Sequence, residues 1–217
     1  MPQLHHDGEL FYLDLGDDEN RMSPDWLTAV EDALTEVQGL PAPRALVTTA
    51  RGKTWSQGLD LEWLTAHPGQ AEDYLRRVHA LLARVLTLPV PCIAAVQGHC
   101  YAAGAMFALA HDAIVMREDR GYLCLPEVDI HLPFTPGMNA LITARLTPAT
   151  AHEAMTTGRR YGGHDALAAG IVTAARPEAE VLPDAQQRAR DLAGKDPVTL
   201  GAIKTQLYAN AVAALTT

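Results

Sequence analysis

The chain has 217 residues, of which 48% are hydrophobic, so it is long enough to form one domain with a sizeable core, with or without a helical appendage. Its formal net charge of −9 argues against nucleic acid as a partner, because that would need a basic face, but a local basic rim could still hold a small anionic ligand. Three cysteines without framework spacing predict reduced thiols and a cytoplasmic location. No apolar run is long enough to span a membrane, so we expect no membrane partner.

Strands and helices are predicted to alternate over the first two thirds of the chain. Apolar runs predict buried strands at residues 9–15, 45–49, 92–96 and 113–116. Helical spacing predicts helices at 24–38, capped by Ser23, and at 71–86. Residues 51–61 are predicted to form a loop with two glycines, 118–121 a charged turn, and 122–130 an extended segment interrupted by proline. This alternation implies an α/β fold.

The last third of the chain has mainly helical patterns. One strand is predicted at 170–174, and no internal repeat is visible. Helices are predicted at 138–146, 148–157, 164–169, 182–193 and 197–214. We therefore divide the chain into an α/β core, residues 1–146, which carries the site, and a mainly helical region, residues 147–217.

The stretch from 91 to 112, PCIAAVQGHCYAAGAMFALAHD, predicts a buried strand, a glycine turn and a helix. The first turn of that helix carries Ala102, Ala103 and Gly104, and such small residues leave backbone N–H groups open to a ligand. The stretch matches neither the GxGxxG pattern nor a phosphate-binding P-loop. Close helix packing is the alternative interpretation.

Two further segments carry candidate chemistry. The loop from Trp55 to Asp60 contains Gly58 and could present the N–H of Leu59, although an ordinary strand-to-helix turn would look the same. Glu127, in LPEVDI, has apolar neighbours that would raise its pKa toward the range of a general base. Glu127 could instead point to water at a strand end, and Asp129 is expected to have a structural hydrogen-bonding role.

Other catalytic chemistries have less support. The only serines are Ser23 and Ser56, and neither lies in a GxSxG motif. Cys100 is better explained as a small buried thiol than as a nucleophile, since no base is visibly paired with it. No His/Cys spacing resembles a zinc site, so we expect no metal.

Taken in order, these pieces resemble the crotonase (enoyl-CoA hydratase/isomerase) family. Four stretches carry the resemblance, followed by a tail in which Thr157-Gly158 and ALAAGIV (166–172) match. The four are Asn20-Arg21-Met22, WSQGLDL (55–61), the glycine turn with its helix (98–112), and LPEVDI (125–130) with Pro133 and Gly137. The resemblance implies a spiral of β-β-α turns, a bent groove for coenzyme A, and a C-terminal helical region that makes the contacts of a homotrimer or of a dimer of trimers.

Residue roles follow from the same resemblance. The N–H groups of Leu59 and Ala103 would form an oxyanion hole for the thioester carbonyl, and Glu127 would be the catalytic acid/base. Coenzyme A would enter as part of an acyl-CoA substrate, with no permanently bound cofactor. The residues expected to bind the substrate are Arg21, Trp55, Gly58, Asp60, Leu61, Ala102, Gly104, Met106, His131 and Pro133.

One departure from the family pattern decides the predicted reaction. Hydratases of this family carry a second glutamate in the first turn of the helix, where this chain has Met106. Glu127 alone suffices to move a double bond, so the sequence is most similar to the single-glutamate Δ3,Δ2-enoyl-CoA isomerases. That subgroup often has glycine where this chain has His131. Hydration, thioester hydrolysis or decarboxylation on the same scaffold, and a catalytically silent CoA-binding subunit, remain the alternatives.

Overall fold

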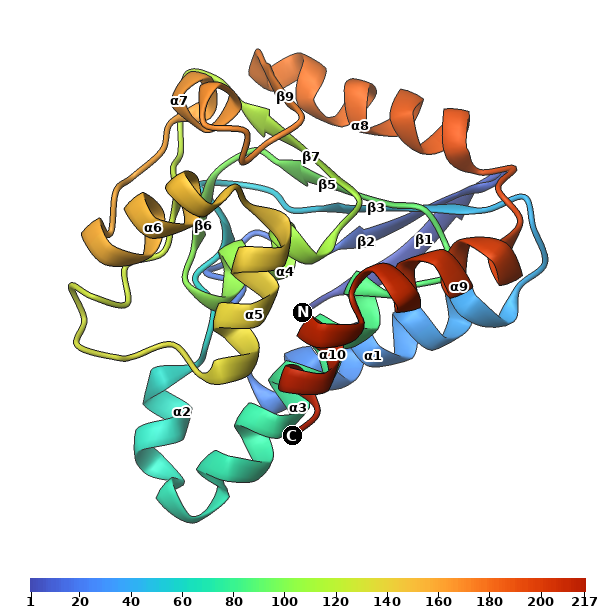
Figure 1. Cartoon of the computed structure of the whole chain (residues 1–217). Helices are drawn as coiled ribbons and strands as arrows, with labels where there is room; N and C mark the ends of the chain where they lie inside the picture. Colours follow the sequence, from blue (N-terminus) through green and yellow to red (C-terminus); the bar gives the residue numbers. More distant parts are fainter.

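The computed structural model describes residues 1–217 and contains two β-sheets (Figure 1). In the large sheet, of order β1-β2-β3-β5-β7-β9, β1 is antiparallel to β2 and the other pairs are parallel. The small sheet, of order β4-β6-β8, is parallel throughout. The strands are β1 (Gln3–Asp7), β2 (Leu10–Asp14), β3 (Ala45–Thr49), β4 (Thr54–Ser56), β5 (Cys92–Val96), β6 (His99–Tyr101), β7 (Ala113–Arg117), β8 (Leu123–Cys124) and β9 (Ala174–Arg176).

The two sheets are built by a repeated β-β-α unit. Each of three successive units places one strand in the large sheet and the next strand in the small sheet, and then enters one or more helices. Because the strand orders are 3-5-7 and 4-6-8, the chain advances as a spiral, as the sequence resemblance predicted. The helices are α1 (Pro24–Gly39), α2 (Leu61–Ala66), α3 (Ala71–Leu86), α4 (Ala103–Ala110), α5 (Pro136–Arg145), α6 (Pro148–Thr157), α7 (Gly163–Ala168), α8 (Glu178–Leu192), α9 (Pro197–Leu207) and α10 (Ala209–Leu215).

Helix α4 forms the centre of the main hydrophobic core. All eight of its residues are buried, as expected for a helix that is apolar on every side. The Phe107 ring lies 5.6 Å from the Trp55 ring and 5.7 Å from the Trp26 ring, so β4 and α1 both pack against this helix. The start of α4 is therefore held firmly in the interior, next to the small sheet.

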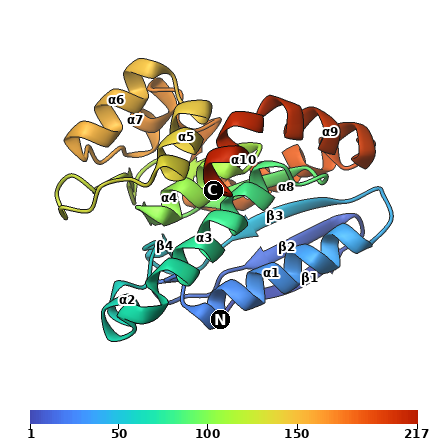
Figure 2. The ribbon, with the colours of Figure 1, turned by 60° about the horizontal axis from the view of Figure 1, so that its bottom comes forward.

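The large sheet is covered on both faces. Helices α1 and α3 lie side by side over one face, as Figure 2 shows. Helix α8 lies over the other face and forms a second core with β2, β3, β5 and β7. The C-terminal segment is tied to the core by buried Lys204, whose Nζ donates to Asp112 at 2.7 Å and to the Leu88 carbonyl at 3.0 Å. The division of the chain at 146/147 stays a prediction.

Several expected elements differ in the structure. Two short strands, β4 and β6, lie where a loop and a glycine turn were expected, helix α2 begins at the last residue of that loop, and β1 pairs with β2 ahead of the first expected strand. The extended segment 122–130 stops after β8, because residues 126–131 turn back with the N–H of Ile130 donating to the Pro126 carbonyl. The strand expected at 170–174 lies at 174–176 instead.

The C-terminal helices also differ in their bounds. Helix α8 starts at Glu178 and carries Pro183 inside, and the helix expected over 197–214 breaks at Tyr208 into α9 and α10. None of the helices combines the length and the hydropathy needed to cross a lipid bilayer. The cytoplasmic location stays a prediction.

Candidate active site

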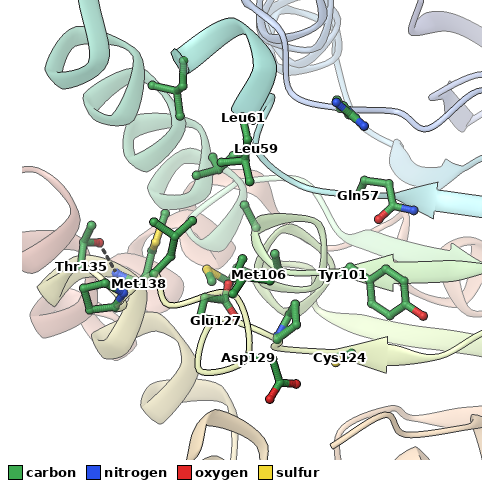
Figure 3. Close-up of a pocket in the computed structure, with 18 of the residues that line it drawn as sticks. Gln57, Leu59, Leu61, Tyr101, Met106, Cys124, Glu127, Asp129, Thr135 and Met138 are labelled. Atoms are coloured by element: carbon green, nitrogen blue, oxygen red, sulfur yellow. Dashed lines mark hydrogen bonds between the residues drawn. The ribbon is translucent and has the colours of Figure 1, made fainter. Parts of the chain in front are cut away.

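A cavity of about 630 Å³ opens where the loop after β4, the start of α4 and the loop after β8 converge (Figure 3). Helices α2, α3 and α5 complete its wall. More than half of its lining residues are hydrophobic, and polar side chains lie among them. Of the predicted site residues, eight line it: Arg21, Leu59, Leu61, Ala102, Ala103, Met106, Glu127 and Pro133.

Two backbone N–H groups at the cavity wall donate to no acceptor in the protein. One belongs to Leu59, and the other to Ala103 at the start of α4, a helix that lacks a side-chain cap. Gly58 brings the two segments together: a Cβ there would lie 2.8 Å from the Ala103 nitrogen, and its φ of +84° suits glycine. The structure thus places both predicted oxyanion-hole donors at the wall of one cavity.

The turn before α4 holds an unusual backbone conformation. Ala102 has a φ of 50° and a ψ of −127°, a region that residues with a side chain rarely adopt. Its N–H donates to the Cys124 carbonyl at 3.0 Å, and its carbonyl accepts from the Met106 N–H at 3.1 Å. Hydrogen bonds from β8 and from α4 itself therefore fix the peptide that carries the Ala103 N–H.

Glu127 is the buried carboxylate of the cavity. It is 7% exposed, and its Oε2 has no hydrogen-bond partner. Burial away from water raises the pKa of this carboxyl from 4.5 to about 7. The other two acidic residues at the wall, Glu62 and Asp129, are exposed. A carboxyl pKa that desolvation shifts within a cleft is typical of a catalytic acid/base.

Met106 supplies an apolar surface beside this carboxylate. It is 1% exposed, lies in the first turn of α4, and lines the same cavity as Glu127, near which it is drawn in Figure 3. No second buried carboxylate lines the cavity. The site therefore offers one buried carboxylate and two backbone donors.

The remaining predicted residues lie behind or beside the cavity. Trp55 is fully buried in the core, and a Cβ on Gly104 would lie 2.7 Å from the Ser56 carbonyl oxygen, so both have packing positions. Asp60 caps α2, accepting from the Trp63 N–H at 3.0 Å. His131, with a φ of 57°, lines a neighbouring hollow that shares Glu127 with the main cavity.

Arg21 lies at the cavity wall but is already engaged. Its guanidinium is 2.8 Å from a carboxylate oxygen of Glu19 and 3.0 Å from one of Glu62, and the hydrogen bond that it donates to Glu62 is the largest of the effects that raise its pKa. A phosphate group would have to compete with these two carboxylates. The ion pair also joins the Asn20–Met22 loop to α2.

Part of the cavity wall lies outside the residues predicted from the sequence. Leu64, Leu75 and Met138, from α2, α3 and α5, add apolar side chains to the lining, and Tyr101, Gln57 and Arg160 add polar ones. Leu75 lies one residue after the buried Tyr74 and three before the buried Val78, at the edge of the apolar face of α3. This helical spacing was the signal available in the sequence.

No activated nucleophile lies at this site. Burial raises the pKa of the Cys100 thiol, and raises that of Cys124 to about 11. The Ser56 hydroxyl is fully used, since it donates to the Asn20 carbonyl at 2.8 Å and accepts from the Gly58 N–H at 3.1 Å. The arrangement suits stabilisation of an enolate better than acyl transfer to the protein.

Comparison with known proteins agrees with this geometry. Residues 10–217 match the family model described as enoyl-CoA hydratase/isomerase. The chain belongs to this family. It is 39% identical to enoyl-CoA delta isomerase 3 of Arabidopsis thaliana over 196 residues, which cover 85% of this chain and 81% of the relative. It is 37% identical to the peroxisomal enoyl-CoA delta isomerase 2 of the same plant, over 83% of this chain and 79% of the relative.

Solved structures give the same fold. The crystal structure of a probable enoyl-CoA hydratase from Mycobacterium tuberculosis matches with a TM-score of 0.91 and 26% identity, covering 99% of this chain and 91% of the other. The protein is therefore an enzyme of the crotonase superfamily, with the isomerase or hydratase activity toward enoyl-CoA that this family supports. Family names alone do not separate the two reactions, whereas the residues around the cavity bear on that choice.

Proposed function

We propose that this enzyme is a Δ3,Δ2-enoyl-CoA isomerase that uses Glu127 as its single acid/base. The carboxylate removes a proton from C2 of a 3-enoyl-CoA, and the C–H electron pair forms a dienolate. The oxyanion accepts hydrogen bonds from the N–H groups of Leu59 and Ala103. The protonated Glu127 then returns its proton to C4, and the double bond comes to lie between C2 and C3.

One observation carries this proposal: Glu127 is the only buried carboxylate of the cavity, and Met106 beside it cannot hold or move a proton. Hydration requires a water molecule to be oriented and deprotonated while a second group delivers a proton to C2. A double-bond shift requires one group that first takes a proton and then gives it back. The delta-isomerase names of the two Arabidopsis relatives support the same reaction.

The pKa of Glu127 suits both halves of this cycle. With a pKa of about 7, the carboxyl group is about half ionised near neutral pH, so the basic and the acidic form are both accessible. A fully solvated glutamate would be a weaker base for a C2 proton. A carboxyl kept permanently neutral could not start the reaction.

The test supplies the purified enzyme with a 3-enoyl-CoA and a 2-enoyl-CoA in separate assays. We expect isomerisation of the first, and a Glu127→Gln variant that loses about 10²–10⁴-fold in kcat while it still binds acyl-CoA. Asp129→Asn, an exposed acid at the same wall, is the matched control and should stay close to wild type. Hydration of the 2-enoyl-CoA without isomerisation, release of free CoA, or full activity of Glu127→Gln would each contradict the proposal.

We also propose a homotrimer or a dimer of trimers, in which the C-terminal helices make the contacts. In support, α9 exposes Val198, Ile203 and Leu207, with 79%, 58% and 67% of their surface accessible in the single chain. Light scattering of the purified protein measures its mass directly. A monomer at micromolar concentration would contradict this assembly.

A further inference from the structure

The loop that carries the Leu59 N–H is held on both sides by hydrogen bonds. The peptide joining Gly58 to Leu59 is anchored through its carbonyl, since Gly58 O accepts from the Met22 N–H at 2.8 Å. In a trans peptide the C=O and the N–H point in opposite directions. A carbonyl fixed toward Met22 therefore directs the Leu59 N–H away from Met22, and Leu59 itself lines the cavity.

Tyr74 on α3 connects this anchor to the residue that follows Leu59. Its hydroxyl donates to the Met22 carbonyl at 2.8 Å and accepts from the Asp60 N–H at 2.9 Å. The side chain is 4% exposed, and burial raises its pKa to about 12, so it stays a neutral donor and acceptor. A single buried hydroxyl thus fixes Met22, whose N–H holds the Leu59 peptide, and also fixes the next peptide along the loop.

Ser56 holds the same loop from the other side. Its buried hydroxyl accepts from the Gly58 N–H at 3.1 Å and donates to the Asn20 carbonyl at 2.8 Å. Asn20 is also buried, with a φ of 49°, and its amide donates to the Trp55 carbonyl at 3.1 Å. The amides before and after Leu59 therefore both have partners, and the amide of Leu59 is the one left to face the cavity.

We propose that the hydroxyls of Tyr74 and Ser56 are positioning groups that aim the Leu59 N–H at the thioester oxygen. Neither hydroxyl needs to touch the substrate. They act through the backbone, and they keep the donor oriented before charge develops on the oxygen, so that no reorganisation is needed during the reaction. The inference rests on the proposed function for the identity of the anion, but the geometry that it tests exists without turnover.

The most direct probe is the carbonyl stretch of a bound thioester that cannot isomerise. Hexanoyl-CoA labelled with ¹³C at the thioester carbonyl is bound to the enzyme and observed by infrared difference spectroscopy. In the wild type, hydrogen bonds to the oxygen should lower the carbonyl frequency relative to free hexanoyl-CoA. In Tyr74→Phe and Ser56→Ala the band should move back toward the free value, while the affinity for CoA is retained.

Kinetics supply a second measurement. Because a misaimed donor loses more in the transition state than in the ground state, we expect kcat to fall while KM changes little. Loss of a whole oxyanion donor lowers kcat about 10²–10³-fold. A donor that is present but misaimed should therefore lower kcat by at most about 10²-fold. Tyr12→Phe is the matched control: that hydroxyl is also buried and accepts from Gln186 Nε2 at 3.1 Å, on the far face of the large sheet. It should change neither the band nor kcat.

The outcomes separate a positioning role from a structural one. If Tyr74→Phe and Ser56→Ala lower the melting temperature but keep the wild-type carbonyl band and kcat, the two hydroxyls serve stability only and the inference is overturned. If one variant does not fold, the other carries the test. A wild-type carbonyl band equal to that of free hexanoyl-CoA overturns the inference without any variant. If the enzyme proved to be a hydratase, only the isomerase proposal would fail, since the probe contains no double bond.

Discussion

Glu127 should make the folded protein less stable wherever it is ionised. Its carboxyl pKa is about 7 in the folded state against 4.5 in the absence of burial, so between these values the folded state binds more protons than the unfolded state. Stability contributed by this group is therefore fully present below pH 4.5 and is lost as the pH rises through 7. The free energy of unfolding falls by about 1.4 kcal/mol for each pH unit between the two pKa values. The total loss is therefore about 3 kcal/mol at pH 8.

Replacing Glu127 by glutamine removes the titration and keeps the shape. We expect Glu127→Gln to unfold with a free energy about 3 kcal/mol higher than wild type at pH 8, and with an advantage below about 1 kcal/mol at pH 5. Urea unfolding of both proteins at each pH, at one fixed protein concentration, measures this difference. Glu36→Gln, at an exposed position of α1, is the matched control and should show no such pH dependence.

The refuting result is specific. An advantage of Glu127→Gln that is absent at pH 8, or equally large at pH 5 and pH 8, would show that burial does not hold this carboxyl partly protonated. The acid/base role in the proposed isomerase would then lose its physical basis. A stabilised but inactive variant is the expected signature of a catalytic group kept in surroundings that oppose its charge.

Three further predictions concern the wall of the site and the core. Gly58→Ala should lower kcat/KM by about 10²-fold, because its Cβ would lie 2.8 Å from the first amide nitrogen of α4; Gly194→Ala, with open space around it, is the control. Met106→Glu should move the pH profile of kcat/KM to higher pH, since a second carboxylate opposes ionisation of the catalytic one, whereas Met106→Gln should not. Lys204→Met should cost about 3 kcal/mol in urea unfolding by leaving the Asp112 carboxylate without its cation, and adding Asp112→Asn should recover part of the loss.

Much of the fold could be predicted because its long elements have clear patterns. The apolar runs of β3 and β5 and the amphipathic stripe of α3 were placed to within a residue. Strands β4 and β6 of the small sheet were not found, because they have three residues each, which is too short for any alternation to show. The two residues of β8 were predicted only as part of a longer extended segment. These strands are defined by their neighbours in the spiral and not by their own sequence.

The candidate site also has residues that could be predicted from the sequence and residues that could not. Leu59, Ala103 and Glu127 could be predicted because each lies in a motif with a recognisable composition, and the structure brings all three to one cavity. The role of the Tyr74 hydroxyl could not be predicted. On the sequence it is one more large residue on the buried face of α3, and its bonds to Met22 and Asp60 span 52 and 14 residues. Contacts of that range depend on the tertiary fold.

The apolar side chain of Met106 affects both the pKa of Glu127 and the reaction that we propose. A carboxylate at position 106 would raise the pKa of Glu127 by repulsion and would also bring water to its side. Desolvation is the largest cause that brings the Glu127 pKa to about 7, and the buried methionine keeps the surroundings of the carboxyl apolar. An apolar site with a single group whose pKa is near 7 favours the return of the same proton over the addition of water. The residue that removes hydration from the proposed chemistry is thus also one that prepares Glu127 for isomerisation.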